Sequence, residues 1–299
     1  MPCMSARFAS VLVTLVLSAP WPAAAQTPSA CDRACLTGIL GGYFSAMAAH
    51  DPSKAALSDR VRATEDTNDV AVGDGLWKTI TALRPYRQNF IDVREGAAAA
   101  FAVAEEAGKP VLVAVRLKVV NRKITEIESM VVRSREEGVL FQPDNMTAPN
   151  AGMTYAPTAA ERNTREDLVR IASLYPAGLR AGSFLDPDVP MSGDAYRFEN
   201  GQKMAGPGCV FQPPSCENMK AQRVPKLPGL TYRVVVVDEE MGAVLLWQNF
   251  GPGSLPGRGS APVGFITFEA FKVYGGKLHA AEAILETLPI GAPSGWDQR

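Results

Sequence analysis

Carboxylates at matched positions are the residues of this sequence whose type and spacing could do chemistry. Glu65-Asp66 and Glu199-Asn200 each close a segment that predicts a strand. Adjacent strand residues point to opposite faces, so only one member of each pair can face a pocket. A carboxylate buried among apolar side chains has a raised pKa and can exchange a proton near neutral pH. The alternative is a carboxylate that caps a turn or accepts backbone N–H groups at a sheet edge.

Glu128 and Glu282 form a second matched pair. By the period of two along a strand, Glu282 shares a face with the apolar residues at positions 278, 280 and 284. That setting predicts either a cavity acid or the partner of an Arg or Lys. His279 is the residue type best suited to general base catalysis near neutral pH, and the alternative is a histidine that is simply hydrogen-bonded. The candidate catalytic set is Glu199, Asn200, Glu282, His279, Glu65 and Asp66.

No standard catalytic or cofactor motif occurs in the sequence. It contains no His-Glu-x-x-His, Gly-x-Ser-x-Gly, phosphate-loop or EF-hand pattern. The glycine cluster at residues 251–259 contains prolines where a dinucleotide-binding turn needs freedom, and it predicts a loop between strands. There are only two histidines, and no spacing of carboxylates supports a metal. We predict no cofactor and no metal site.

Four blocks of sequence recur in the same order, which predicts an internal duplication. The clearest is a strand, a two-residue turn, a Lys-aliphatic pair and a second strand that ends in Glu. The turn is Gly275-Gly276 in the second copy, a hairpin signal, and the weaker Asn121-Arg122 in the first. The matched blocks are residues 36–49 with 163–180, 62–67 with 196–201, 92–101 with 238–247, and 117–128 with 271–282.

The order of the predicted elements indicates the α+β class. Each copy reads as a helix, a strand and then three long antiparallel strands joined by tight turns. Residues 76–83 predict a second helix in the first copy, where the second copy instead has a Pro- and Cys-containing insertion at residues 206–228. The predicted organisation is a first domain over residues 31–134, a linker rich in Pro and Asn over 135–160, and a second domain over 161–296.

The N-terminal segment has the features of a signal peptide. Arg7 precedes an apolar run at residues 8–17, and Ala23-Ala24-Ala25 offers the small residues of a cleavage site. The run is too short to cross a membrane as a helix. We therefore predict that residues 1–25 are removed, that the protein is periplasmic or secreted, and that the mature chain has no membrane partner.

Four of the five cysteines remain after residue 25, an even number that predicts two disulfides in an oxidising compartment. The local pairs Cys31–Cys35 and Cys209–Cys216 are favoured because the members of each are close in sequence. The alternative is a four-thiolate zinc site, for which these spacings are irregular. A net charge of −1 and scattered Lys and Arg residues exclude nucleic acid as a partner.

The repeated pattern resembles the nuclear-transport-factor-2-like superfamily. The resemblance rests on Glu-(Asn/Asp) after the first helix and on the Lys-aliphatic hairpins, and it covers residues 31–133 and 168–296. A closing pattern at Pro289–Trp296 is similar to that of an exported bacterial and fungal family of that superfamily. The resemblance implies two cone-shaped domains, each a curved, mostly antiparallel sheet around N-terminal helices and an apolar pocket. It also leads us to expect Asn where the first copy has Asp66.

These features predict a protein that binds a small, largely apolar organic molecule. One hypothesis is an enzyme that converts this molecule by carboxylate acid/base chemistry, as an isomerase, lyase or hydrolase. The other is a non-catalytic ligand-binding or interaction protein, with a purely structural module as a third option. The chain is expected to be a monomer with an internal pseudo-dimer, or a homodimer. If one cavity is active, we predict that it is the C-terminal one, because Glu282 and His279 occur there.

Overall fold

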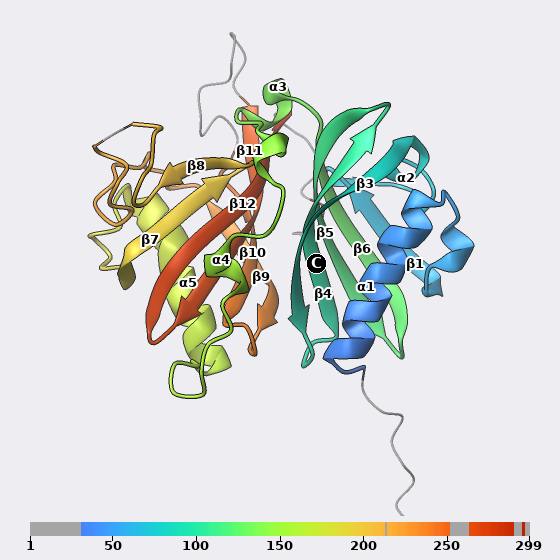
Figure 1. Ribbon diagram of the computed structural model, residues 1–299, viewed down its shortest axis with the longest axis horizontal. Coiled ribbons are helices and arrows are strands. Elements are labelled where there is room, and N and C mark those ends of the chain that lie inside the picture. Colours follow the sequence, from blue (N-terminus) through green and yellow to red (C-terminus); the bar gives the residue numbers. More distant parts are fainter. Residues whose placement is uncertain (1–30, 213, 252–262, 290–294, 297–299) are drawn as a thin grey trace, which may run out of the picture. The chain divides into compact units, whose positions relative to one another are not determined.

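The computed structural model describes residues 31–212, 214–251, 263–289 and 295–296. The predicted signal peptide, most of the predicted glycine-rich loop and most of the closing pattern lie outside these residues. The described residues form an α+β structure with two six-stranded sheets in two similar halves (Figure 1). Among these residues, no helix combines the length and the apolar character needed to cross a membrane.

The first half has strand order β2-β1-β6-β5-β4-β3, in which β1 runs parallel to β6 and the other neighbours are antiparallel. Asp32 caps the first helix by accepting the N–H of Cys35. The elements are α1 (Arg33–Ala48), the 3₁₀ turn η1 (Pro52–Lys54), β1 (Leu57–Glu65), β2 (Asn68–Asp69), α2 (Leu76–Thr79), β3 (Ile80–Asp92), β4 (Ala97–Glu106), β5 (Lys109–Val120) and β6 (Lys123–Val132).

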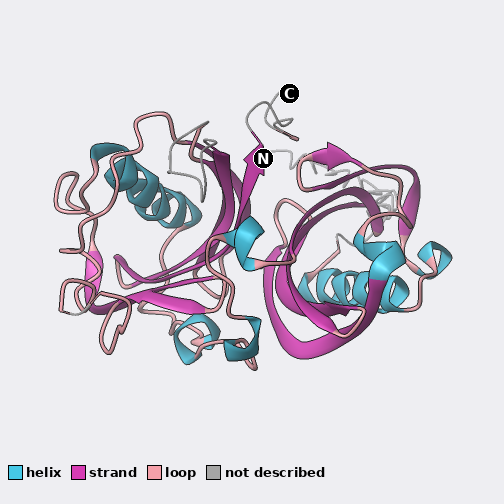
Figure 2. Ribbon diagram, turned by 90° about the horizontal axis from the view of Figure 1, so that it is seen from above, coloured by secondary structure: helices cyan, strands magenta, loops and turns pink. Residues whose placement is uncertain are grey.

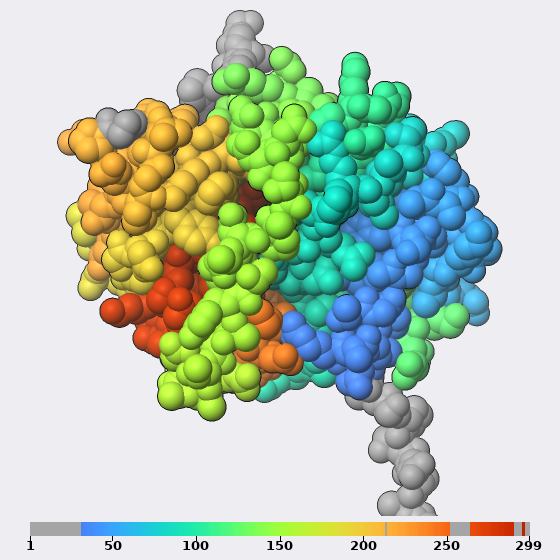
Figure 3. Space-filling model, viewed as in Figure 1, coloured from blue at the N-terminus to red at the C-terminus, as the bar shows by residue number. Residues whose placement is uncertain are grey.

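The second half repeats this topology, with order β8-β7-β12-β11-β10-β9 and β7 parallel to β12. Its elements are α5 (Arg165–Ala181), β7 (Met191–Glu199), β8 (Gln202–Ala205), β9 (Thr231–Asp238), β10 (Ala243–Asn249), β11 (Val263–Tyr274) and β12 (Lys277–Pro289). The intervening residues form α3 (Arg135–Gly138), the 3₁₀ turn η2 (Pro143–Asn145) and α4 (Ala151–Thr154). This connecting segment lies along the surface between the halves (Figure 3).

Both predicted hairpins form, and they occupy the same place in the two sheets. They join β5 to β6 and β11 to β12. Asn121 and Arg122 have φ values of 49° and 62°, and Gly275 and Gly276 have values of 54° and 73°. Two successive positive φ values are those of the two-residue turn that matches the twist of paired strands.

The helix predicted over residues 76–83 is wrong beyond its first turn. α2 ends at Thr79, and β3 begins at Ile80. Pro85 then lies within β3, where the pairing with β4 shifts register between Leu83 and Arg87. β3 is an edge strand, and an edge strand tolerates a proline at such an irregularity because the missing N–H is not needed by a neighbour.

The central strands β4 and β10 are buried on both faces, whereas the strands toward the sheet edges are partly exposed. Alternate residues of β4 illustrate this: Ala98, Ala100 and Ala102 belong to the core under α1. Ala99 and Phe101 belong to a second core that also contains residues of β10, β11 and β12. Each long helix therefore covers the face of its sheet that points away from the other half (Figure 2). A strand buried on both faces has no polar alternation, which explains the run AAAAFAVA.

Two reciprocal ion pairs join the halves. Asp92 accepts bonds of 2.7 and 3.0 Å from the guanidinium of Arg165, the first residue of α5. Its counterpart Asp238 accepts bonds of 2.7 and 2.9 Å from Arg33, the first residue of α1. Each aspartate also accepts, at 2.9 Å, the backbone N–H of the residue that precedes the other aspartate. The contact is therefore self-complementary, as in an interface with twofold symmetry.

Both favoured cysteine pairs are disulfides in the structure. Cys31–Cys35 spans the start of α1, and Cys209–Cys216 closes a loop in the insertion between β8 and β9. Both cysteines of the second pair are buried. The disulfides fit a protein of an oxidising compartment.

Candidate functional site

A cavity of about 350 Å³ lies in the second half. It lies between α5, the strands β7, β11 and β12, and the insertion at residues 211–227. Small-molecule sites typically measure ~300–1,000 Å³, so this cavity is large enough for a compact organic ligand. Most of its wall is apolar, including Leu140, Leu179, Met204, Leu227, Phe250 and Phe265.

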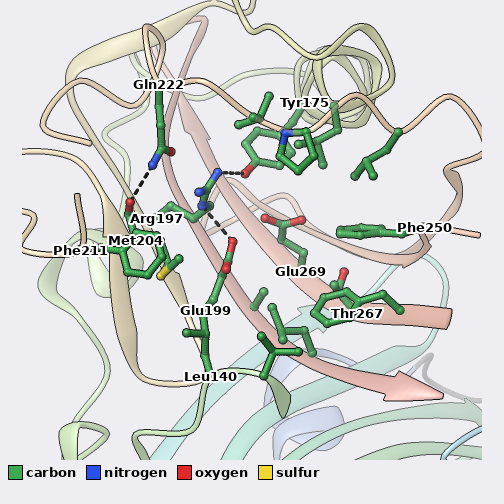
Figure 4. Close-up of a pocket in the computed structure, with 18 of the residues that line it drawn as sticks. Leu140, Tyr175, Arg197, Glu199, Met204, Phe211, Gln222, Phe250, Thr267 and Glu269 are labelled. Carbon is green, nitrogen blue, oxygen red and sulfur yellow. Dashed lines mark hydrogen bonds and ion pairs between the residues drawn. The ribbon is translucent and has the colours of Figure 1, made fainter. Parts of the chain in front are cut away.

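A buried arginine organises the polar wall of the cavity. Arg197 and Glu199 lie two residues apart on β7 and therefore on one face, and their ion pair measures 2.9 Å. Arg197 also donates a hydrogen bond of 3.1 Å to the hydroxyl of Tyr175 on α5. Burial raises the pKa of Tyr175, so this phenol remains protonated. Figure 4 shows these three side chains converging on the cavity.

Glu269 on β11 completes the polar wall. Its side chain is buried and accepts a hydrogen bond from Gln248 on the neighbouring strand β10. Burial, and next the negative charge of Glu199, raise the pKa of Glu269 to about 8, against the lowering effects of Arg197, Gln248 and Tyr175. Arg197 supplies one positive charge to two carboxyl groups and contacts Glu199 directly. Glu269 therefore holds a proton at neutral pH and can exchange it close to that pH.

The pKa of Glu269 has a consequence for stability. The unfolded chain loses this proton near the ordinary pKa of 4.5, whereas the folded chain keeps it up to about 8. Between these values the folded state binds more protons, so the free energy of unfolding falls as the pH rises. Glu269→Gln cannot ionise, so its free energy of unfolding should not show this fall. From pH 5 to pH 8, the free energy of unfolding of the variant should increase relative to that of wild type by on the order of 2 kcal/mol.

Urea unfolding at the two pH values, without reductant, measures this difference. The exposed Glu217→Gln serves as the control, and it should show the pH dependence of the wild type. Equal slopes for wild type and Glu269→Gln would show that Glu269 is ionised throughout.

The corresponding region of the first half is filled. A cavity of about 10 Å³ remains there, lined by Tyr43, Trp77 and Glu65 among others. The ring of Trp77 packs edge-on against Tyr43 at 5.2 Å, and its Nε1 donates to the Tyr43 hydroxyl at 3.2 Å. Three polar residues of the second cavity have apolar counterparts by strand register: Ala63 for Arg197, Val113 for Thr267 and Val115 for Glu269. Gln248, which donates to Glu269, corresponds to Ala102, whereas Glu199 corresponds to another glutamate, Glu65.

Glu282 lies on the opposite face of β12 from the cavity, which corrects the expectation that it lines the cavity. It accepts hydrogen bonds from Asn150 at 2.8 Å and Tyr196 at 3.0 Å, beside a hole of about 30 Å³ between the halves. A polar hole of that size holds water rather than an organic ligand. Burial raises the pKa of Glu282 to about 7. The raised pKa expected from the sequence is therefore present, at a site without a ligand cavity.

Asp66 and Asn200 occupy equivalent turns rather than strand positions. Their φ values are 50° and 45°, so each lies in the left-handed region. The side-chain oxygen of Asp66 accepts the N–H of Val131 at 2.7 Å, and that of Asn200 accepts the N–H of Leu285 at 3.0 Å. The amide nitrogen of Asn200 donates to three backbone carbonyls. These contacts match the alternative in which the side chain binds backbone groups at a turn.

The remaining candidates are divided between the two halves. Glu199 lines the large cavity. Glu65 accepts the N–H of Leu76 at 2.8 Å, at the start of α2, and forms an ion pair of 2.9 Å with Arg133. His279 stacks on the ring of Tyr274 with centroids 3.5 Å apart, and burial lowers the pKa of its imidazole. Of the predicted catalytic set, only Glu199 reaches the cavity.

Sequence reasoning missed Tyr175, Arg197, Thr267 and Glu269. Glu269 is the one charged residue in the apolar segment from Gly264 to Phe271, and comparison with the first copy would have set it against Val115. Arg197 likewise aligns with Ala63 in the matched blocks at residues 196–201 and 62–67. Positions that are polar in only one of the two copies are therefore the sequence feature that indicates this cavity. Among the residues that the structure describes, no group of three His, Cys, Asp or Glu side chains could hold a metal ion.

Comparison with known proteins adds a family model but no activity. A model described as a domain of unknown function, DUF8021, matches residues 161–285, within the half that contains the cavity. No curated protein matches the chain.

Solved structures match part of the chain. They include a de novo designed protein with a curved β-sheet (18% identity, 33% of this chain and 87% of that chain, TM-score 0.30). An NTF2-like protein of unknown function from Shewanella baltica OS155 is 15% identical and covers 34% of this chain and 94% of its own (TM-score 0.25). A candidate ketosteroid isomerase from Kribbella flavida DSM 17836 is 14% identical and covers 42% and 92% (TM-score 0.26). At these scores the similarity does not extend to function.

Proposed function

We propose that the second half binds a small, largely apolar organic molecule and that Glu269 exchanges a proton with it. The observation that carries this proposal is the convergence of Arg197, Tyr175 and a protonated Glu269 on one wall of an otherwise apolar cavity of about 350 Å³. A pocket of this composition holds the ligand by its apolar surface and orients it by the few polar groups.

The proposal includes the location and organisation of the protein. An exported chain would have residues 31–134 as a first, cone-like domain, residues 135–160 as a linker and residues 161–296 as the ligand-binding domain. The first domain would then act as a scaffold, because its own interior is filled by Trp77. The disulfides support export.

Binding of Prodan, an uncharged naphthalene ketone whose emission moves to shorter wavelength in apolar surroundings, tests the cavity. We expect saturable binding by wild type that weakens several-fold between pH 7 and pH 9, because an ionised Glu269 cannot donate to the ketone and is costly to bury. In Glu269→Gln the affinity should be independent of pH over this range. Leu179→Trp replaces an aliphatic side chain of the cavity wall with a bulky indole ring and should abolish binding.

Glu282→Gln is the matched control. Glu282 is another buried glutamate with a raised pKa, on the strand next to β11 but on the opposite face. This variant should retain both the affinity and the pH dependence of wild type. A loss of pH dependence in Glu282→Gln, with none in Glu269→Gln, would contradict the assignment of the cavity acid.

Proton exchange with the bound ketone separates an enzyme from a binding protein. Prodan carries exchangeable hydrogens next to its carbonyl, and mass spectrometry in D₂O detects their replacement. Exchange that wild type accelerates and Glu269→Gln does not, rising as the pH approaches 8, supports acid/base catalysis. Saturable binding with no acceleration favours the alternative of a non-catalytic ligand-binding protein.

A further inference from the structure

Two uncharged polar atoms of the cavity lining have no hydrogen-bond partner among the residues that the structure describes. They are Oγ1 of Thr267 and Oε1 of Gln222, and these residues are 1% and 7% exposed. The amide of Gln222 is oriented by its own nitrogen, which donates to the carbonyl of Met204 at 2.9 Å. Its oxygen is therefore left as an acceptor (Figure 4). A buried polar atom without a partner is costly, so each of these atoms indicates a missing hydrogen-bonding group.

The two atoms require different hydrogen-bonding partners. Oε1 of Gln222 can only accept a hydrogen bond, so its partner must carry an O–H or N–H group. The hydroxyl of Thr267 can donate or accept. Thr267 is two residues from Glu269 on β11 and lies on the same face, whereas Gln222 belongs to the insertion on another wall. A ligand that satisfies both atoms carries polar groups at two separate points.

The charges of the cavity wall balance without a ligand ion. Arg197 pairs with Glu199, and Glu269 is protonated at neutral pH. Arg223, which also lines the cavity, is exposed to solvent. An anionic ligand would lie beside two carboxyl groups with no buried cation left to pair with it. The balance therefore favours an uncharged ligand.

We propose that the natural ligand is an uncharged, largely apolar molecule with at least one hydroxyl group, which donates to Oε1 of Gln222, and a second oxygen that meets Thr267 and Glu269. This inference rests on the proposed binding function and names its ligand class. The first half provides a contrast that supports this inference. Its interior is filled, and it has Val113 and Val115 at the positions equivalent to Thr267 and Glu269.

Matched naphthalene probes test the ligand class by displacement of Prodan at pH 7. The set is 2-acetylnaphthalene, its 5-, 6- and 7-hydroxy derivatives, and 6-hydroxy-2-naphthoate. We expect at least one hydroxy ketone to bind about 10-fold more tightly than the parent ketone, since a good hydrogen bond to a buried orphan group is worth about that factor. The naphthoate should bind about 10-fold more weakly than the corresponding hydroxy ketone.

Two variants assign the effect to the proposed atoms. In Gln222→Met the preference for the hydroxy ketone over the parent should fall to within about 3-fold. Thr267→Val preserves the shape of the side chain and should weaken the parent ketone and its hydroxy derivatives together. Glu282→Gln should leave every ratio unchanged.

The outcomes separate this inference from the proposed function. Prodan binding with no preference for any hydroxy ketone, or with naphthoate binding as tightly as the ketones, overturns the ligand class and leaves the cavity function intact. A hydroxy preference that survives in Gln222→Met also overturns it. Failure of Prodan to bind to wild type contradicts the proposed function and this inference with it.

Discussion

Asp92→Asn and Asp238→Asn should each destabilise the whole structure by about 2–4 kcal/mol, because each leaves a guanidinium and a backbone N–H poorly paired. The side chains of both aspartates are almost completely buried, at 2% and 1% exposed. Their arginines differ: Arg165 is 16% exposed and Arg33 is 30% exposed. Water compensates a lost partner better at the more exposed arginine, so Asp92→Asn should cost more.

Urea unfolding measures these costs. Asp69→Asn is the control, because Asp69 also pairs with an arginine, Arg62, but is 74% exposed. An exposed ion pair contributes about 0–1 kcal/mol, so this substitution should be nearly neutral. If Asp92→Asn were as mild as Asp69→Asn, the reciprocal contact would not hold the halves together.

Trp77→Ala should destabilise the structure by about 3–5 kcal/mol, the usual cost of removing a large buried aromatic side chain. Trp77 is 5% exposed and fills the interior that corresponds to the second cavity. Its removal loses the contact with Tyr43 and leaves a hole with apolar walls at Ala63 and Val113. Glu65 also borders this hole, but the space that the ring leaves against the apolar residues should accept an aromatic molecule of matching size.

Indole provides the measurement. Added at millimolar concentration, it should raise the melting temperature of Trp77→Ala by more than it raises that of wild type, because it binds only the folded state of the variant at the new hole. Trp77→Phe is the graded control and should be less destabilised and less responsive. An indole effect equal in wild type and Trp77→Ala would show that the interior collapses around the missing ring.

The sequence predicted the parts of the fold that depend on local chemistry. The hairpins followed from Gly275-Gly276 and from a repeated pattern, and α1 and α5 from the matched helical blocks at residues 36–49 and 163–180. Even the repeated lysine has a local reason: Lys118 and Lys272 donate to the carbonyls of Glu95 and Met241, the equivalent residues of two tight turns. That lysine recurs because it closes a turn.

The site was harder to predict, for a physical reason. Glu282 shares a face with Ala280 and Ile284 as expected, but Leu278 belongs to the other core because the strand shifts register between positions 278 and 280. Both faces of β12 are apolar, so periodicity cannot tell the face that lines a cavity from the face that packs on another sheet. Repetition between the copies identified residues that build the frame. The cavity residues are those at which the copies differ.

The reciprocal Asp92 and Asp238 contacts also bear on how this protein can change over generations. Where two identical chains meet through a twofold contact, one substitution alters both at once. In such a dimer, a tryptophan that fills the interior of one chain would also fill that of the other. An arginine introduced in one interior would likewise be present in both. With both halves in a single polypeptide, each position is inherited separately. The halves can therefore keep their reciprocal contact while the residues of their interiors diverge, as Ala63 and Arg197 do.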